Sequence, residues 1–128
     1  MHIAETLGKT DDAKIFKDRL KLQREATHKL SYDSETGKYI KGYQVDQAFA
    51  LVSGVTPASE KEKVTANLVD NVLYKFPYYD TGSSGQALYT RYFTESGERM
   101  DLIYELLQDK HHPSYGYFLE QGKTVWPE

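Results

Sequence analysis

Residues 96–102, SGERMDL, repeat the pattern of residues 7–13, LGKTDDA: a Gly, an Asp four positions later, and then an apolar residue. Glycine commonly ends an α-helix, and an acidic residue is favoured in the first turn of the next helix. Both stretches therefore predict a short turn that joins one helix to another. A repeated helix–turn–helix unit is typical of stacked αα-hairpins, arranged either as an open solenoid or as a closed toroid.

The pattern of apolar residues predicts helices around the first of these turns. Residues 1–7 form the predicted last turns of one helix, which ends at Gly8, and the next helix runs from Thr10 to about Leu30. The predicted apolar stripe of this second helix contains Ala13, Phe16, Leu20, Thr27 and Leu30, with Ile15, Leu22 and Ala26 beside it.

The middle of the chain predicts a turn and two further helices. Residues 32–39, YDSETGKY, are rich in turn-forming residues, and the apolar run over residues 43–52 predicts a buried inner helix. A cap at Thr56 followed by Pro57 predicts the start of another helix, which ends before Pro77.

The last part of the chain repeats this organisation. Residues 80–96 predict a Gly-rich loop and then a helix that ends at Gly97, and residues 98–110 predict an amphipathic helix. After Pro113 the sequence predicts a loop or short extended structure. With no βαβ alternation, the whole pattern predicts an all-α fold of stacked αα-hairpins.

Composition excludes several classes of function. The net charge of -3 and the pI near 5.8 argue against a nucleic-acid-binding surface, which usually carries a basic excess. No apolar run approaches the length of a membrane span, so no membrane partner is predicted. The absence of cysteine excludes disulfides and thiolate metal sites, and the compartment stays undetermined.

Three local patterns fall short of known binding or catalytic motifs. The loop DTGSSGQ over residues 80–86 lacks the Lys of a phosphate loop, and neither Ser83 nor Ser84 lies in a nucleophile elbow. His111 and His112 are adjacent and cannot chelate one metal from a single helix face. Residues 33–37 only partly match a calcium loop, because the Gly falls early and no Glu closes it. No metal and no cofactor are predicted.

Carboxylates are the best chemical candidates, because glycoside hydrolysis needs two acidic groups. Asp80, Glu120 and Glu128 all lie in predicted loops or helix ends near aromatic residues. Taken alone, each of them is better explained as a solvated surface acid.

Residues 78–128 resemble the end of the catalytic domain of bacterial α-L-rhamnosidases, glycoside hydrolase family 78. The matching stretches are Thr81–Gly82, FTESGERMDLIYELL over 93–107, PSYGYFLEQGKT over 113–124 and VWPE over 125–128. Upstream, LGKTDDAKIFKDRL, DSETGKY and GYQVDQAFAL, which includes Gln44, resemble the preceding helices and turn. The resemblance therefore covers essentially the whole chain.

This resemblance implies part of an (α/α)6 toroid that hydrolyses terminal α-L-rhamnose with inversion, so the implied partner is a rhamnose-containing carbohydrate. The implied general base is Glu128. Tyr115, Trp126 and Asp80 are the implied substrate-binding residues. The sequence departs from the family in two places: Tyr115 replaces a Trp, and Pro127 separates Trp126 from Glu128, which leaves the register of the base open.

The acidic loop that supplies the family's general acid has no counterpart in this chain. We therefore expect residues 1–128 to be a C-terminal part of one catalytic domain, inactive alone, with exposed apolar edges that favour self-association. Two alternatives stay open: a non-catalytic, tetratricopeptide-like binding module, although no period of 34 residues recurs, and a six-hairpin glycosidase for another sugar.

Overall fold

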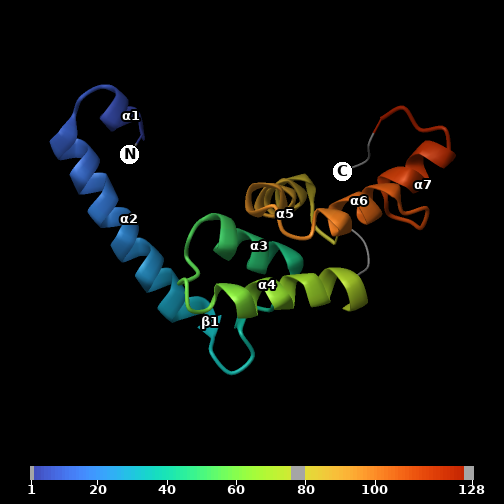
Figure 1. The fold of residues 1–128 in the computed structure, drawn as a ribbon, viewed down its shortest axis with the longest axis horizontal. Helices are drawn as coiled ribbons and strands as arrows, with labels where there is room; N and C mark the ends of the chain where they lie inside the picture. Colours follow the sequence, from blue (N-terminus) through green and yellow to red (C-terminus); the bar gives the residue numbers. More distant parts are fainter. Residues whose placement is uncertain (1, 76–79, 126–128) are drawn as a thin grey trace.

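The computed structural model of the chain describes residues 2–75 and 80–125, and almost all of its regular structure is helical (Figure 1). The elements, in chain order, are α1 (His2–Thr6), α2 (Thr10–Ser31), β1 (Tyr32–Asp33), β2 (Lys38–Tyr39), α3 (Gln44–Val52), α4 (Lys61–Asp70), its π-helical continuation η1 (Asn71–Lys75), α5 (Ser83–Ser96), α6 (Met100–Gln108) and α7 (Tyr115–Glu120). The predicted all-α class and the helix–turn–helix repeats are confirmed.

The helices form consecutive hairpins. Helices α3 and α5 pack against each other as an inner pair, while α4 covers α3 and α6 packs on α5. Their contact buries Ala48, Val64, Leu68, Tyr89, Phe93 and Leu102, none of which is more than 1% exposed. The core thus lies between the second and third hairpins.

Both predicted turns of the repeated Gly–Asp pattern are present. Gly8 and Gly97 adopt left-handed backbone angles, with φ of 68° and 69°, and each follows the end of a helix. Glycine has no Cβ and takes up this conformation without steric cost. The repeated Gly–Asp pattern in the sequence therefore corresponds to a repeated turn between two helices in the fold.

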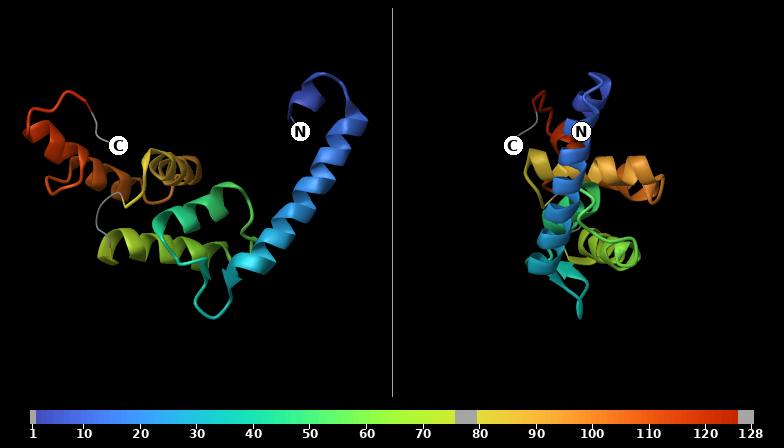
Figure 2. Two further views of the ribbon diagram at one scale, coloured as in Figure 1. Left: turned by 180° about the vertical axis from the view of Figure 1, so that it is seen from behind. Right: turned by 90° about the vertical axis from the view of Figure 1, so that its left-hand side faces the viewer.

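Most of the predicted apolar stripe of α2 lies outside the core of the described residues. Of its five residues only Ala13 is buried, while Phe16 is 49% exposed and Leu30 is 87% exposed. The reason is the direction of α2, which leaves the α3–α4–α5 body and has α1 at its far end (Figures 1 and 2). The foot of α2 is held to the body by Arg24, whose Nε donates to the Ser53 carbonyl oxygen at 2.7 Å.

Two boundaries also differ from prediction. Helix α4 begins at Lys61, because residues from Pro57 to Glu60 close a turn in which the Glu60 N–H donates to the Pro57 carbonyl oxygen at 3.0 Å. The segment after Pro113 is the short helix α7 rather than a loop or an extended segment. The Ser114 hydroxyl caps α7 by accepting from the Tyr117 backbone N–H at 3.0 Å.

Over the described ranges, no helix combines the length and the apolar character that a membrane crossing requires.

Candidate functional site

The segments that enter α3, α5 and α7 are tied together by side-chain hydrogen bonds. Gln44, at the start of α3, accepts from the Asp80 backbone N–H through Oε1 at 3.2 Å. Gln86, in the first turns of α5, donates from Nε2 to the Tyr115 hydroxyl at 2.5 Å. The N-terminal ends of α3, α5 and α7 therefore form one connected region, which is the candidate site.

Gln44 links the first two of these helix ends from a fully buried position, with 0% exposure. A buried amide is stable only when its polar atoms have partners, so its side chain fixes the direction of the chain at Asp80. The neighbouring Tyr43 backbone N–H donates to the Asp46 carboxylate at 3.1 Å, which closes the first turn of α3. The start of α3 is thus rigidly defined on the side that faces Asp80.

The Gly-rich entry to α5 is explained by packing. A Cβ atom at Gly85 would lie 2.6 Å from the Thr81 Cβ, so the Thr81 side chain lies directly over the first turn of the helix. Gly82 caps the helix in an extended conformation, and the Gln86 N–H donates to its carbonyl oxygen at 3.1 Å. The loop therefore allows a close approach of Thr81 to α5.

The entry to α7 depends on a second close approach. Ser114 donates its hydroxyl to the Asp109 carbonyl oxygen, and the Tyr117 N–H donates to the same oxygen at 3.2 Å. A Cβ at Gly116 would overlap that oxygen, so only glycine fits there. This packing holds the N-terminal end of α7 against the end of α6 and presents the half-buried Tyr115 to Gln86.

Hydrogen bonds and one salt bridge tie together the same joint. Burial raises the pKa of Asp109, but hydrogen bonds from the His111 backbone N–H at 3.0 Å and its ring Nδ1 at 2.7 Å outweigh this effect and lower the pKa overall. Lys110 pairs with Glu120 at 2.5 Å, which raises the pKa of the lysine. Glu120, one of the three carboxylates considered from sequence, therefore has a structural partner on the α6–α7 turn.

The partial calcium-binding pattern of residues 33–37 lies in a loop whose carbonyl oxygens bind a lysine side chain of the same chain. The Lys63 ammonium donates to the Ser34 carbonyl oxygen at 2.7 Å and to the Glu35 carbonyl oxygen at 3.2 Å. The Asp33 carboxylate accepts from the Thr36 hydroxyl at 2.8 Å and from the Glu35 N–H at 2.9 Å, and these two hydrogen bonds lower its pKa. The Ser34 and Glu35 carbonyl oxygens therefore bind Lys63, and the Asp33 carboxylate binds groups of the loop itself.

No metal cluster is found in the part of the chain that the structure describes: no three His, Cys, Asp or Glu side chains are grouped to hold an ion there. His111 pairs with Asp109, whereas the His112 ring lies edge-on to Tyr117 at 5.3 Å between centroids. The two histidines therefore have different neighbours.

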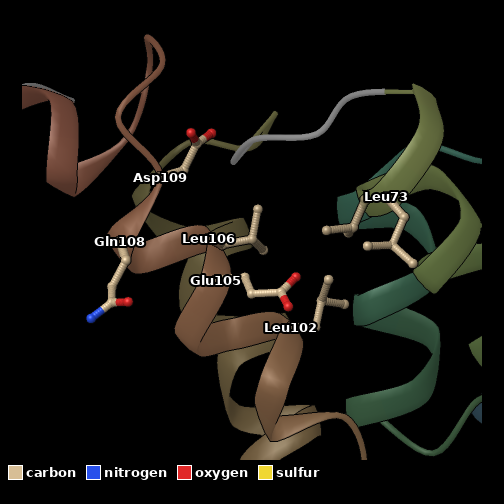
Figure 3. Close-up of a pocket in the computed structure, with 7 residues that line it drawn as sticks. Leu73, Leu102, Glu105, Leu106, Gln108 and Asp109 are labelled. Carbon is tan, nitrogen blue, oxygen red and sulfur yellow. The ribbon is translucent and has the colours of Figure 1, made fainter.

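A cavity of about 380 Å³ lies elsewhere, between η1 and α6 (Figure 3). Leu73, Leu102 and Leu106 point into it, with the Glu105 carboxylate at its edge. Neither Asp80 nor Tyr115 lines this cavity, so we regard it as a packing gap between outer helices rather than as part of the candidate site.

Of the four residues that the sequence assigns to the site, two can be placed. Asp80 is exposed at the entry to α5, and Tyr115 is half-buried at the start of α7. Trp126 and Glu128 lie outside the described residues. The sequence-based site omitted Gln44 and Gln86. Gln44 lies at the start of the predicted inner helix, where a polar side chain among apolar neighbours is the detectable signal, and Gln86 lies at the start of the helix predicted after the Gly-rich loop.

Comparisons with known proteins agree with this arrangement. A family model for the bacterial alpha-L-rhamnosidase 6 hairpin glycosidase domain matches residues 1–128. An α-L-rhamnosidase of Alteromonas sp. (strain LOR) is 30% identical over 121 residues, which are 93% of this chain and 13% of that protein. One from Formosa agariphila is 27% identical over 124 residues, covering 96% of this chain and 13% of its own length.

A solved structure shows the same fold. The crystal structure of native α-L-rhamnosidase from Aspergillus terreus matches 97% of this chain and 14% of its own, with a TM-score of 0.87 and 21% sequence identity. The chain thus spans 13% to 14% of the length of these three proteins. The resemblance found in the sequence, and the part of a helical toroid that it implied, are confirmed.

Proposed function

We propose that this chain, which belongs to the family of bacterial α-L-rhamnosidase six-hairpin glycosidase domains, supplies the general-base side of a site that hydrolyses terminal α-L-rhamnose. The observation that carries this proposal is the connected region at the starts of α3, α5 and α7, joined by the Gln44–Asp80 and Gln86–Tyr115 hydrogen bonds. Such a region combines an aromatic face, a carboxylate and fixed amides, which together suit a sugar ring with several hydroxyl groups.

In this proposal Tyr115 and Trp126 form apolar walls against the sugar, and Asp80 accepts hydrogen bonds from its hydroxyl groups. Glu128 acts as the general base: it removes a proton from a water molecule while that water attacks the anomeric carbon and the glycosidic bond breaks. The reaction inverts the anomeric configuration, since one carboxylate activates water on the face opposite the leaving group.

The general acid of this reaction belongs to another part of a longer protein. An inverting pair of carboxyl groups stands about 6.5–9.5 Å apart, on the two faces of the sugar. The relatives are longer than the matched region, which makes up 13% of two of them. We therefore assign residues 1–128 to one part of a single (α/α)6 catalytic domain, and we expect the separate chain to release no product from an aryl α-L-rhamnoside.

A segment exchange tests the assignment of the base. Residues 1–128 replace the matching region of the Alteromonas sp. relative, and hydrolysis of an aryl α-L-rhamnoside is measured. We expect the chimera to be active, and Glu128→Gln to lower kcat by at least about 100-fold, the scale of general-base catalysis. Glu120→Gln is the matched control, because Glu120 pairs with Lys110 and is expected to leave kcat within a few-fold.

The sugar is tested in the same chimera. Aryl glycosides of other terminal sugars are offered beside the rhamnoside, and the rhamnoside is expected to have the highest kcat/KM. A higher value for another sugar would favour the alternative six-hairpin glycosidase, while equal loss of activity in the Glu128 and Glu120 variants would contradict the proposed base.

A further inference from the structure

The segment that leads into α3, residues 39–43, has a strained backbone. Two of its residues have left-handed backbone angles, with φ of 52° at Ile40 and 76° at Gly42. Glycine adopts such angles at little cost, whereas a β-branched residue does so only with steric strain. Ile40 is also 72% exposed, so burial of its side chain does not offset the strain. A strained conformation persists only where the surrounding structure fixes it. We call residues 39–43 the entry segment.

Two buried amide side chains fix the entry segment, one on each side of Ile40. Gln47 of α3 accepts through Oε1 from the Tyr39 backbone N–H at 3.3 Å. Asn71, the first residue of η1, donates from Nδ2 to the Gly42 carbonyl oxygen at 2.8 Å. Gln47 is 0% exposed and Asn71 is 3% exposed. The strained residue is therefore held between two interior hydrogen bonds from different helices.

Only half of each amide group is used in this way. Within the described part of the chain, Gln47 Nε2 and Asn71 Oδ1 are buried and make no hydrogen bond to a protein group. Neither amide can be turned round, because the Tyr39 N–H requires an acceptor and the Gly42 carbonyl requires a donor. The hydrogen bond to the entry segment is thus the feature that favours an amide over an apolar side chain at both positions.

The neighbouring Asn67 shows what is particular to Asn71. Asn67 lies four residues earlier on the same helix face, and its Nδ2 donates to the Thr36 and Gly37 carbonyl oxygens at 3.0 and 2.9 Å. These oxygens belong to the turn between β1 and β2, whereas the oxygen bound by Asn71 belongs to the entry segment. Two asparagines of one helix face therefore hold two different parts of the same connection.

The entry segment leads directly to the candidate site. Gly42 lies two residues before Gln44, whose Oε1 accepts from the Asp80 backbone N–H at 3.2 Å. A displacement of Gly42 would move the first turn of α3 and with it the Gln44 side chain. The hydrogen bond made by Asn71 is therefore connected to the position of Asp80 through one short stretch of backbone.

We propose that Asn71 and Gln47 are positioning residues for the sugar site: they lock the entry segment and thereby set Gln44 and, through it, Asp80. This rests on the proposed function, in which Asp80 accepts hydrogen bonds from the sugar hydroxyl groups. Neither amide touches the substrate. Loosening Asp80 weakens binding of the substrate and of the transition state alike, which raises KM and leaves kcat nearly unchanged.

Kinetics of the chimera with the Alteromonas sp. relative test this effect. Asn71→Leu should raise KM for an aryl α-L-rhamnoside by about threefold to tenfold, with kcat within about twofold of the wild type. Asn67→Leu is the matched control: it removes the same group from the same helix face and should leave KM unchanged. In an Asp80→Ala background, Asn71→Leu should cause no further increase in KM, because the two changes act on one interaction.

A rescue variant tests the role of the strained backbone. Asparagine adopts the left-handed conformation more readily than isoleucine does, so Ile40→Asn reduces the strain that the amides oppose. Ile40→Asn combined with Asn71→Leu should return KM to within about twofold of the wild type, since less holding is then needed. A KM that stays as high as in Asn71→Leu alone would contradict the proposed lock.

Hydrogen exchange in the separate chain distinguishes failure of this proposal from failure of the proposed function. Asn71→Leu should raise the exchange rate of the Asp80 amide between about twofold and fivefold, the scale of one lost hydrogen bond, whereas Asn67→Leu should not. Gln47→Leu, which releases the other side of the entry segment, should act like Asn71→Leu and replaces it if circular dichroism shows that Asn71→Leu does not fold.

Two results would overturn the proposal: an unchanged exchange rate at Asp80 in the variants of the lock, or an equal KM in the Asn71→Leu and Asn67→Leu chimeras. A wild-type chimera without activity would contradict the proposed function alone, and the exchange rates would then decide whether Asn71 positions Asp80.

Discussion

At the scale of single residues, the candidate site depends on one glycine and two glutamines that bring different segments of the chain into contact. Gly116 lies against the end of α6, where the space for a Cβ is already occupied by the Asp109 and Gln108 carbonyl oxygens. Gln44 and Gln86 each use one amide to hold the entry of a neighbouring helix. None of these three residues has a reactive group, so their contribution is to position the residues that do.

Replacing Gly116 with Ala should destabilise the chain, because the new methyl group would overlap the Asp109 carbonyl oxygen and the backbone would have to shift. We expect the free energy of unfolding to fall by about 1–3 kcal/mol, as for other overpacking changes. Denaturant unfolding followed by circular dichroism measures it. Gly82→Ala is the matched control: a Cβ at Gly82 would have no neighbouring atom within 4 Å, and the φ of this residue is -62°, so a loss below about 1 kcal/mol is expected.

Replacing Gln44 with Leu should free the Asp80 backbone N–H while keeping the side-chain volume. The loss of one hydrogen bond, worth about 1 kcal/mol, should raise the rate of hydrogen exchange at the Asp80 amide about fivefold. Exchange measured by NMR gives the rate at that single amide. Gln86→Leu removes the bond to Tyr115 instead and should leave the Asp80 amide unchanged; an equal increase in both variants would show that the effect is not local.

At the scale of elements, the joint between α6 and α7 combines a helix cap, a close backbone approach, a hydrogen-bonded carboxylate and one salt bridge. Ser114 caps α7, Asp109 receives two hydrogen bonds from His111, and Lys110 pairs with Glu120. A helix of 6 residues is too short to be stable in isolation, so α7 depends on these tertiary contacts. The position of Tyr115 therefore depends on the joint as a whole.

This joint should make part of the stability sensitive to acid. The pKa of Asp109 is lower in the folded chain than its ordinary value near 4, so its contribution is fully present above about pH 4 and is lost as the pH falls through the folded pKa. Asp109→Asn removes the charge. We expect the difference in unfolding free energy between wild type and variant to be about 1 kcal/mol at pH 7 and to shrink below pH 4.

The measurement is a series of denaturant titrations of both proteins between neutral and acid pH. The difference between the two proteins isolates Asp109 from Asp33 and Asp101, whose pKa values are also lowered by their own hydrogen bonds. A difference that stays constant over the whole range would mean that the asparagine acts through packing and not through the lost charge.

Sequence patterns predicted most elements because their signals are local. Helix α2 begins at the predicted Thr10, and Gly97 ends α5 as expected. Helix α7 was missed because its stability comes from contact with α6, which no local pattern records. Periodicity also predicted the apolar stripe on α2, but periodicity shows only that a face is apolar and does not show what covers it.

The same limit applies to the candidate site. The family resemblance implies Tyr115, whereas Asp80 is first a candidate as a carboxylate in a predicted loop near aromatic residues. Neither a single aromatic residue nor a single carboxylate has a distinctive local pattern. Gln44 and Gln86 were not assigned to the site because their importance depends on a partner 36 and 29 positions away in the sequence. Such pairs become visible only when the inner helices are placed side by side.

At the scale of the whole molecule, the chain has a core at its centre and two apolar edges. Leu68 and Phe93 are fully buried between the second and third hairpins, whereas Leu22 on the first hairpin is 66% exposed. The first hairpin is therefore joined to the rest of the chain mainly through the foot of α2, at Arg24 and at His28, whose Nδ1 lies 2.7 Å from the Tyr39 hydroxyl.

If the isolated chain self-associates through its exposed apolar residues, as expected from its sequence, its thermal stability should depend on protein concentration. Association favours the folded state by mass action, because the unfolded chain does not form the interface. The thermal midpoint of the wild type should therefore rise as concentration increases. Leu22→Glu and Tyr104→Glu should each reduce this dependence, since each places a charge at a largely exposed apolar position while leaving the buried core intact. Ala66→Glu, which places the same charge at an exposed position on α4 away from Leu22 and Tyr104, should follow the wild type. Circular dichroism and calorimetry together cover a wide range of concentration. A wild-type midpoint that stays constant over that range would show that the isolated chain does not self-associate.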